Sequence, residues 1–285
     1  MNYLPLIIIG APRSGTNMLR DVLTQLPSFA TWPCDEINYI WRHGNVQYPT
    51  DEFTVAMARP AVKQYIRKQF DWVANRYQAD VVVEKTCANS LRVEFVKQVV
   101  PEARYIFIRR DGLDAIGSAM QRWHAQLDLP YILKKARFVP ISDLPYYGSR
   151  YLWNRMYRLI SRRKRLAFWG PQFDGMTESL GQYSLEEVCA LQWQKCVENS
   201  ASALAKLPET QWVEVSYENL VQTPQVELER ILQALQIPIE KEDLNIATQS
   251  ITNKSVGKGR KKLSEPVHQK LEVLIGDTLH KYGYA

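Results

Sequence analysis

Short apolar runs, each bounded by charged or turn-forming residues, recur along this chain. The runs at 4–9, 81–83, 105–108 and 211–215 have the length of single buried strands. Between them, apolar residues return at helical spacing, as in the segment 56–77, whose other face is charged. Strands that alternate with amphipathic helices predict an α/β fold, in which a parallel sheet lies between two layers of helices.

This alternation fades between residues 126 and 183, where two proline-containing turns lead into a segment rich in arginine and aromatic residues. The chain has 285 residues and is 46% hydrophobic, which is enough for one core of ordinary size. We therefore expect a single domain, 1–285, with a helical insertion at 126–183.

The sequence has neither of the apolar signatures of a membrane protein or a secreted one. The longest apolar runs hold about six residues, whereas a membrane-spanning helix needs roughly 20. A signal peptide has basic residues before its apolar run, and no basic residue precedes the first run here. The four cysteines form no C-x-x-C pair, and the four histidines are scattered. We expect a cytoplasmic protein without a metal site or a disulfide framework.

The formal net charge of +6 is concentrated in one region. Residues 134–169 hold ten lysines or arginines and one acidic residue. Three interpretations are open: a lid over the site of an acidic substrate, a helix that leans on an anionic membrane surface, or the solvated basic face of a packed helix. Membrane contact is the least favoured of the three.

The apolar run at 4–9 is followed by a glycine-containing turn and then by helical spacing. At such a strand-to-helix turn, the free N–H groups and the helix dipole form a seat for a phosphate-like anion. A nucleoside triphosphatase has a lysine directly after the second glycine, whereas the only cation here precedes that glycine by two positions. A turn without a ligand is the alternative. The residues expected to bind the anion are Arg13, Ser14, Gly15, Thr16 and Asn17.

A second strand end carries a carboxylate beside an amine. Glu84 and Lys85 follow the apolar run at 81–83. The carboxyl ends of parallel strands meet at one edge of the sheet, where open α/β sheets place their chemistry. We expect Asn89 or Ser90 to cap the helix that follows.

A third strand end carries arginine. The run at 105–108 is followed by Arg110, then by Asp111 as a helix N-cap, and two helical turns later by Ser118. The guanidinium of Arg110 and the hydroxyl of Ser118 can hold one anion from two directions.

Two later segments extend this pattern. Tyr217 follows the strand at 211–215 and can pack in the core. Further on, a segment of glycines and cations can let the backbone approach a phosphate and neutralise it. A nucleic-acid patch is the competing interpretation, which we do not favour because the predicted sheet helices carry no further basic stripe. This segment contributes Gly257, Lys258, Gly259 and Arg260.

An aromatic segment at 32–45 also holds Asp35, Glu36, Arg42 and His43. It contains more polar side chains than an aromatic core segment usually does. It can line a substrate pocket, or it can be a surface loop held by its two tryptophans.

Taken together, these motifs resemble those of the sulfotransferases that use PAPS (3′-phosphoadenosine 5′-phosphosulfate). The loop 13–17 is similar to their 5′-phosphosulfate loop. The pattern Arg-Asp-x-x-Asp-x-x-x-Ser at 110–118 looks like their 3′-phosphate site, with Gly112 in place of the usual proline. The YENL at 217–220 resembles their YEDL, whose tyrosine lies near the adenine, and the GKGRK at 257–261 is similar to the C-terminal phosphate loop of the heparan sulfotransferases.

The segment Glu84-Lys85-Thr86 is similar to the strand end of bacterial and heparan N-sulfotransferases, in which the glutamate is taken as the catalytic base. Cytosolic steroid and phenol sulfotransferases have a histidine after the Lys-Thr pair. That position here is Cys87, so the resemblance gives the role of base to Glu84 and disfavours the small-phenol subfamily.

The resemblance covers residues 4–20, 80–124 and 185–283. It implies a P-loop-like fold and a transfer of the sulfuryl group from PAPS, without a metal, to a hydroxyl or amine, with PAP (3′-phosphoadenosine 5′-phosphate) as the second product. The acceptor is expected to be a carbohydrate or other small molecule, which can be anionic, with the insertion as its lid. Glu84 would take the proton, and Arg13 and Lys85 would stabilise the departing phosphate. The alternatives are a P-loop kinase and a nucleotide-binding module without catalysis.

Overall fold

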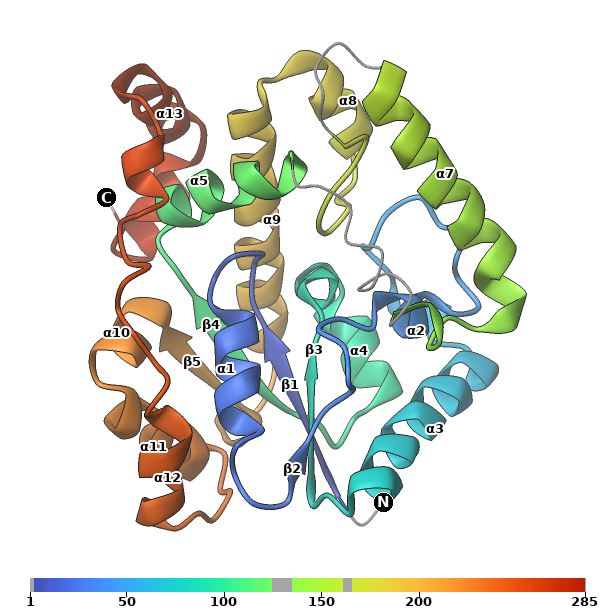
Figure 1. Cartoon of the computed structure of the whole chain (residues 1–285), viewed down its shortest axis with the longest axis vertical. Coiled ribbons are helices and arrows are strands. Elements are labelled where there is room, and N and C mark those ends of the chain that lie inside the picture. Colours follow the sequence, from blue (N-terminus) through green and yellow to red (C-terminus); the bar gives the residue numbers. More distant parts are fainter. Residues whose placement is uncertain (1–2, 125–134, 161–165, 285) are drawn as a thin grey trace.

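The computed structural model describes residues 3–124, 135–160 and 166–284. Within these residues, five parallel strands form one sheet in the order β2-β3-β1-β4-β5 (Figure 1). The four predicted strands are confirmed, while β2 has two residues and is too short to recognise in the sequence. The strands are β1 (Leu4–Ile9), β2 (Phe29–Ala30), β3 (Val81–Lys85), β4 (Arg104–Arg109) and β5 (Trp212–Ser216).

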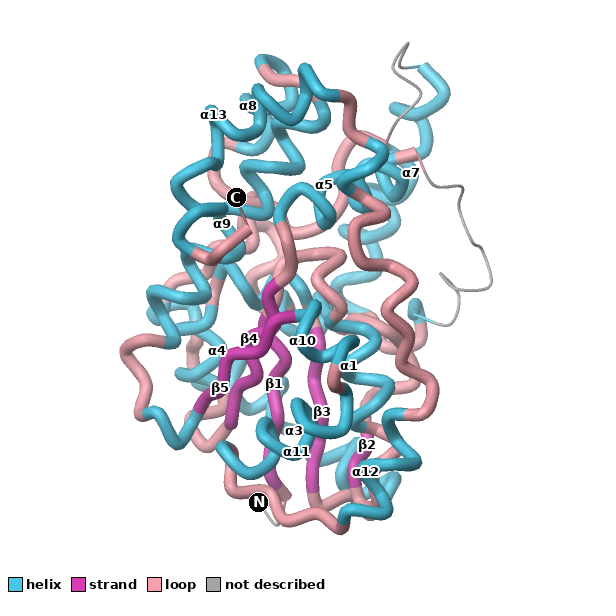
Figure 2. The backbone as a smooth tube through the Cα atoms, turned by 90° about the vertical axis from the view of Figure 1, so that its left-hand side faces the viewer, coloured by secondary structure: helices cyan, strands magenta, loops and turns pink. Residues whose placement is uncertain are grey.

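The strand order brings the three predicted site segments together. β1 lies between β3 and β4, and its Ile8 is in register with Lys85 while its Ile9 is in register with Phe107. All three strands are parallel, so their carboxyl ends reach the same edge of the sheet. Figure 2 shows this edge, with α5, α8 and α13 beyond the upper ends of the strands.

Alternate side chains of the strands face two separate cores. Leu6 and Ile8 point into one core, and Ile7 and Ile9 point into the other. The first core is covered by α1 (Thr16–Leu23), α10 (Tyr217–Gln222), α11 (Pro224–Ala234) and α12 (Lys241–Thr248). The second is covered by α2 (Asn38–Arg42), α3 (Pro60–Tyr77), α4 (Val93–Val99), α5 (Gly112–Trp123), α9 (Leu185–Leu204) and α13 (Glu265–Lys281). The predicted three-layer fold is thereby confirmed.

The local signals at helix starts have mixed outcomes. Asp111 caps α5 as predicted, because its side chain accepts a hydrogen bond from the backbone N–H of Leu113 at 2.8 Å. The helix predicted from residue 56 begins later, at Pro60, because residues 55–57 form the 3₁₀ turn η1 (Val55–Met57) and proline is suited to the first position of a helix. The other short turns are η2 (Cys87–Leu91), η3 (Ile141–Asp143), η4 (Glu209–Gln211) and η5 (Arg260–Lys262).

The described part of the insertion is helical, with α7 (Leu144–Ile160) and α8 (Met176–Gln182). Parts of the predicted lid, 125–134 and 161–165, lie outside the described residues. An ion pair and a hydrogen bond join the start of the insertion to the aromatic segment 32–45: Lys135 with Asp35 at 2.8 Å, and His43 Nδ1 with Asp143 Oδ2 at 2.8 Å. No helix in the described part of the chain is long and apolar enough to cross a membrane.

Candidate active site

The loop between β1 and α1 has the backbone of an anion seat. Arg13 and Gly15 both have positive φ, 71° and 88°, and Gly15 precedes α1 as an N-cap without a side-chain acceptor. A Cβ at Gly15 would lie 2.4 Å from Cδ2 of Tyr217, so glycine is required there. The hydroxyl of Ser14 is buried and has no hydrogen-bond partner among the described residues. An unpaired buried hydroxyl beside free helical N–H groups fits an anionic ligand.

Positive charge converges on this loop. Arg13 donates from Nε to the hydroxyl of Ser118 at 2.9 Å, and its carbonyl accepts from Arg110 Nη1 at 2.9 Å. Burial, together with the charges of Arg122 and Arg110, lowers the pKa of Arg13 below its usual value. The two predicted anion sites, the loop 13–17 and the pair Arg110 and Ser118, are therefore in direct contact. Thr16 is buried beneath the loop, while Asn17 is exposed on α1.

Sequence reasoning missed Arg122. It lies four residues after Ser118 on α5, so both side chains lie on one face of the helix, and its charge acts on Arg13. The signal was available in the sequence as an arginine at helical spacing from a predicted phosphate ligand. Arg122 is exposed, unlike Arg110, and can approach a ligand from solvent.

The guanidinium of Arg110 is held inside the protein. It pairs with the buried carboxylate of Asp114 at 2.5 Å, donates to the carbonyl of Ser255 at 2.5 Å, and stacks on the ring of Tyr217 at 4.3 Å. Tyr217 is thus packed between the loop at Gly15 and Arg110. Its predicted contact with adenine stays a prediction.

The glycine-rich segment near the C-terminus packs on α5. The carboxylate of Asp114 accepts hydrogen bonds from the backbone N–H groups of Gly257 at 3.0 Å, Gly259 at 2.5 Å and Arg260 at 3.1 Å. A Cβ at Gly259 would lie 1.9 Å from the carbonyl oxygen of Asp114, so this glycine permits the approach to α5. The side chains of Lys258 and Arg260 remain exposed at this edge.

The carboxylate of Glu84 is enclosed by protein. The side chain is fully buried, its Oε1 accepts from the hydroxyl of Thr86 at 2.6 Å, and its Oε2 accepts from Asn89 Nδ2 at 2.9 Å. Burial raises the pKa of Glu84 to about 7. The predicted helix cap at Asn89 or Ser90 is wrong, since both are buried and α4 begins after Arg92 without a side-chain cap.

A second carboxylate, that of Glu36, reaches the same strand end from the segment 32–45. Its Oε1 lies 2.9 Å from Nζ of Lys85 and 3.5 Å from the backbone N of Cys87, and its side chain is 32% exposed. Burial acts to raise the pKa of Glu36, but the charges of Lys85 and Lys135 outweigh burial and lower the pKa below its usual value. Glu36 is therefore ionised at neutral pH, and its side chain is partly exposed.

Cys87 connects this carboxylate to the anion loop. Its backbone N–H faces Glu36, and its Sγ lies 3.7 Å from Oγ1 of Thr16. Burial raises the pKa of the Cys87 thiol to about 12, so the thiol is protonated and is not a nucleophile at neutral pH. The path from Glu36 through Cys87 to Thr16 places a carboxylate next to the anion seat.

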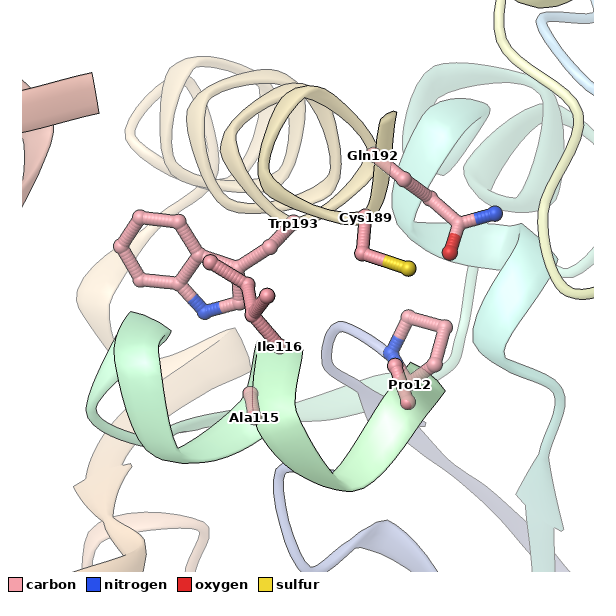
Figure 3. A pocket seen from close by; sticks show the side chains of 7 residues that line it. Pro12, Ala115, Ile116, Cys189, Gln192 and Trp193 are labelled. Atoms are coloured by element: carbon pink, nitrogen blue, oxygen red, sulfur yellow. The ribbon is translucent and has the colours of Figure 1, made fainter. Parts of the chain in front are cut away.

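The loop is packed tightly from behind. Pro12 faces Cys189 and Gln192 of α9 and Ile116 of α5 across a gap of about 10 Å³ (Figure 3). This is the room that about one water molecule needs. A ligand larger than a water molecule therefore has no room on this side of the loop.

The model of the family described as "Sulfotransferase family" matches residues 5–139 and 152–241. The chain belongs to the sulfotransferase family. The match includes the anion loop, Glu36, Glu84, Lys85 and the Arg110 segment. A search of curated protein sequences finds no match.

Solved sulfotransferases share the P-loop-like fold of this family member. The sulfotransferase domain from the curacin biosynthetic pathway is 15% identical, with 100% of this chain and 99% of that chain covered and a TM-score of 0.55. The sulfotransferase domain of the Synechococcus PCC 7002 olefin synthase is 13% identical, with 95% and 94% covered and a TM-score of 0.53. Mouse sulfotransferase SULT7A1, solved in complex with PAP, is 12% identical, with 98% and 84% covered and a TM-score of 0.52. At these identities the likeness concerns the fold.

Proposed function

We propose that this chain transfers the sulfuryl group from PAPS to a hydroxyl or amine of a small acceptor. The observation that carries the proposal is the adjacency of an anion seat and an ionised carboxylate, which Cys87 joins through its contacts with Thr16 and Glu36. The unpaired hydroxyl of Ser14 and the charges around Arg13 suit the phosphosulfate. The complex of mouse SULT7A1 with PAP supports the choice of nucleotide.

We assign the role of catalytic base to Glu36 in place of Glu84. A general base must come within hydrogen-bond distance of the proton that it removes. Glu36 is 32% exposed beside Lys85, whereas Glu84 is 0% exposed and both its oxygens already accept hydrogen bonds. Positioned proton transfer contributes typically about 10²–10⁴-fold to a rate.

The transfer then balances as a single displacement at sulfur. The acceptor oxygen or nitrogen forms a bond to sulfur while its proton passes to Glu36. The bond from sulfur to the bridging oxygen breaks, and its electron pair stays on the phosphate of PAP. Arg13 and Lys85 supply the positive charge that stabilises this oxygen, which is the kind of preorganised electrostatic contribution that is often largest.

The insertion 126–183 is our candidate for the acceptor lid. The ion pair Lys135–Asp35 and the hydrogen bond between Asp143 and His43 hold it against the segment that carries Glu36. The excess of basic residues at 134–169 favours an acidic or carbohydrate acceptor over an apolar one. We propose a cytoplasmic location, since the described residues hold all four cysteines as thiols, as is usual in a reducing compartment.

The proposal is tested by incubating the chain with PAPS and a panel of hydroxyl and amine acceptors. Mass spectrometry should show a product heavier by one sulfuryl group, and PAP should accumulate. Replacement Glu36→Gln should lower turnover by about 10²–10⁴-fold and retain PAP binding. The matched control is Glu102→Gln, because Glu102 is 35% exposed and lies 2.9 Å from Arg67, as Glu36 does from Lys85.

The two alternatives give different results. A kinase predicts that ATP with Mg²⁺ raises the melting temperature more than PAP does. A binding module without catalysis predicts PAP binding but no product with any acceptor, and the same behaviour for Glu36→Gln as for the wild type. Either result would contradict the proposal.

A further inference from the structure

The buried Glu84 is connected to the segment that carries Glu36 by two chains of hydrogen bonds. In the first, the hydroxyl of Thr86 donates to Glu84 Oε1 at 2.6 Å and accepts from the backbone N–H of Ile37 at 3.3 Å. All the groups of this chain are buried. It ends on the residue directly after Glu36.

The second chain runs through Asn89. Asn89 donates from Nδ2 to Glu84 Oε2 at 2.9 Å, and its Oδ1 accepts from Nε of Arg92 at 2.9 Å. Arg92, whose side chain is fully buried, donates from Nη2 to Oδ1 of Asn38 at 2.5 Å. This chain ends two residues after Glu36, at the first residue of α2.

We infer that Glu84 is a positioning residue, which sets the place of Glu36 through Thr86 and Asn89. The inference rests on the proposed function, in which Glu36 is the base. In the ionised form of Glu84 both oxygens act only as acceptors, and each fixes the orientation of one relay side chain. The donors at Ile37 and Arg92 would otherwise be buried without these oriented partners.

The arrangement explains why the strand end needs two charged residues in succession. Lys85 holds the carboxylate of Glu36 directly, at 2.9 Å. Glu84 points to the other side of the strand and holds the backbone that follows Glu36. A base must be held within a fraction of an ångström for efficient proton transfer, and a displacement of about 1 Å can cost a hundredfold in rate.

The sharpest test is Thr86→Val, which removes the hydroxyl and keeps the shape of the side chain. We expect kcat to fall on the order of tenfold to a hundredfold, with the affinity for PAP unchanged. Hydrogen exchange at the Ile37 amide should become about tenfold faster. Thr86→Ser, which restores a hydroxyl, should recover both values. Thr248→Val removes an equally buried hydroxyl from α12, where it donates to the carbonyl of Leu244 at 2.7 Å, and should change neither.

A positioning role also predicts that the effects of Glu36 and Thr86 are not additive. Combining Thr86→Val with Glu36→Gln should reduce turnover no further than Glu36→Gln alone. Glu84→Gln should lower kcat as Thr86→Val does. The amide can accept a hydrogen bond from one of the side chains Thr86 and Asn89, but it presents a donor to the other. Wild-type exchange at Ile37 together with wild-type kcat in Thr86→Val would overturn the inference. Absence of turnover in the wild-type chain would refute the proposed function, and exchange at Ile37 would still decide the positioning role.

Discussion

Asp114 is the residue at which we expect a change of one atom to have the largest effect on the proposed nucleotide site. It is 1% exposed and lies under the C-terminal segment, where one carboxylate receives three backbone N–H groups and the guanidinium of Arg110. The replacement Asp114→Asn keeps the volume of the side chain. It removes the negative charge opposite Arg110 and turns one acceptor atom into a donor.

The magnitude follows from these contacts. Removing one partner of a buried ion pair typically costs about 3–5 kcal/mol, and each buried donor left unpaired costs about 1–3 kcal/mol. The amide of the variant would retain one acceptor oxygen, so we expect a loss of about 3 kcal/mol in the free energy of unfolding. For a chain of this size, this corresponds to a fall in melting temperature on the order of 5–10 °C.

The assay is thermal and urea unfolding, combined with calorimetric titration of PAP. We expect lower stability and at least about tenfold weaker PAP binding, equal to about 1.4 kcal/mol, because Arg110 and the segment 255–260 lose their common anchor. Glu94→Gln is the control, since Glu94 pairs with Lys206 where both side chains are more than half exposed, and such pairs contribute at most about 1 kcal/mol. An Asp114→Asn variant that melts with the wild type and binds PAP equally well would refute the reasoning.

Three further predictions concern the pH dependence of stability, the anion loop at Gly15, and Arg122. Because the pKa of Glu84 is about 7 in the fold and lower in the unfolded chain, the folded state holds an extra proton between these values, so this group's contribution to stability falls as pH rises toward 7. Glu84→Gln should remove that contribution. Urea unfolding should show that, from pH 5 to pH 7, the free energy of unfolding of the variant rises by on the order of 2–3 kcal/mol relative to that of the wild type. If the difference between variant and wild type is the same at both pH values, the raised pKa of Glu84 is contradicted. Gly15→Ala should prevent PAP binding because of the positive φ and the contact with Tyr217, whereas Gly148→Ala, with no atom within 4 Å of the new Cβ, should bind PAP normally and melt no lower. Arg122→Ala should weaken PAP binding about tenfold at low salt and less at high salt, and titrations at two ionic strengths that show no change would exclude a direct role.

The fold could be predicted from the sequence because its signals are local. The apolar runs at 4–9, 81–83, 105–108 and 211–215 have the length of single buried strands, and the helices predicted between them can serve as crossovers to parallel neighbours. The strand β2 gives no such signal, because it has only two residues and forms by pairing with β3, which is distant in the sequence.

The anion loop could be predicted for the same reason. Arg13, Ser14 and Gly15 are neighbours in the chain, and a glycine between a strand and a helix determines the backbone that binds an anion. Arg110 and Ser118 are likewise related by the spacing of one helix. Their contact with Arg13 depends instead on β1 and β4 being adjacent, which no residue pattern states.

What the sequence determined by itself was the set of strand ends and the chemistry that each one carries, since strand length, turn residues and helical spacing are properties of nearby residues. Which carboxylate is enclosed and which is partly exposed was decided only by the tertiary structure. Glu84 and Glu36 are 48 positions apart in the chain and reach one strand end. Their exposure differs because α2 and the segment before it cover Glu84 and leave Glu36 partly open, and the burial of a side chain depends on packing between distant segments.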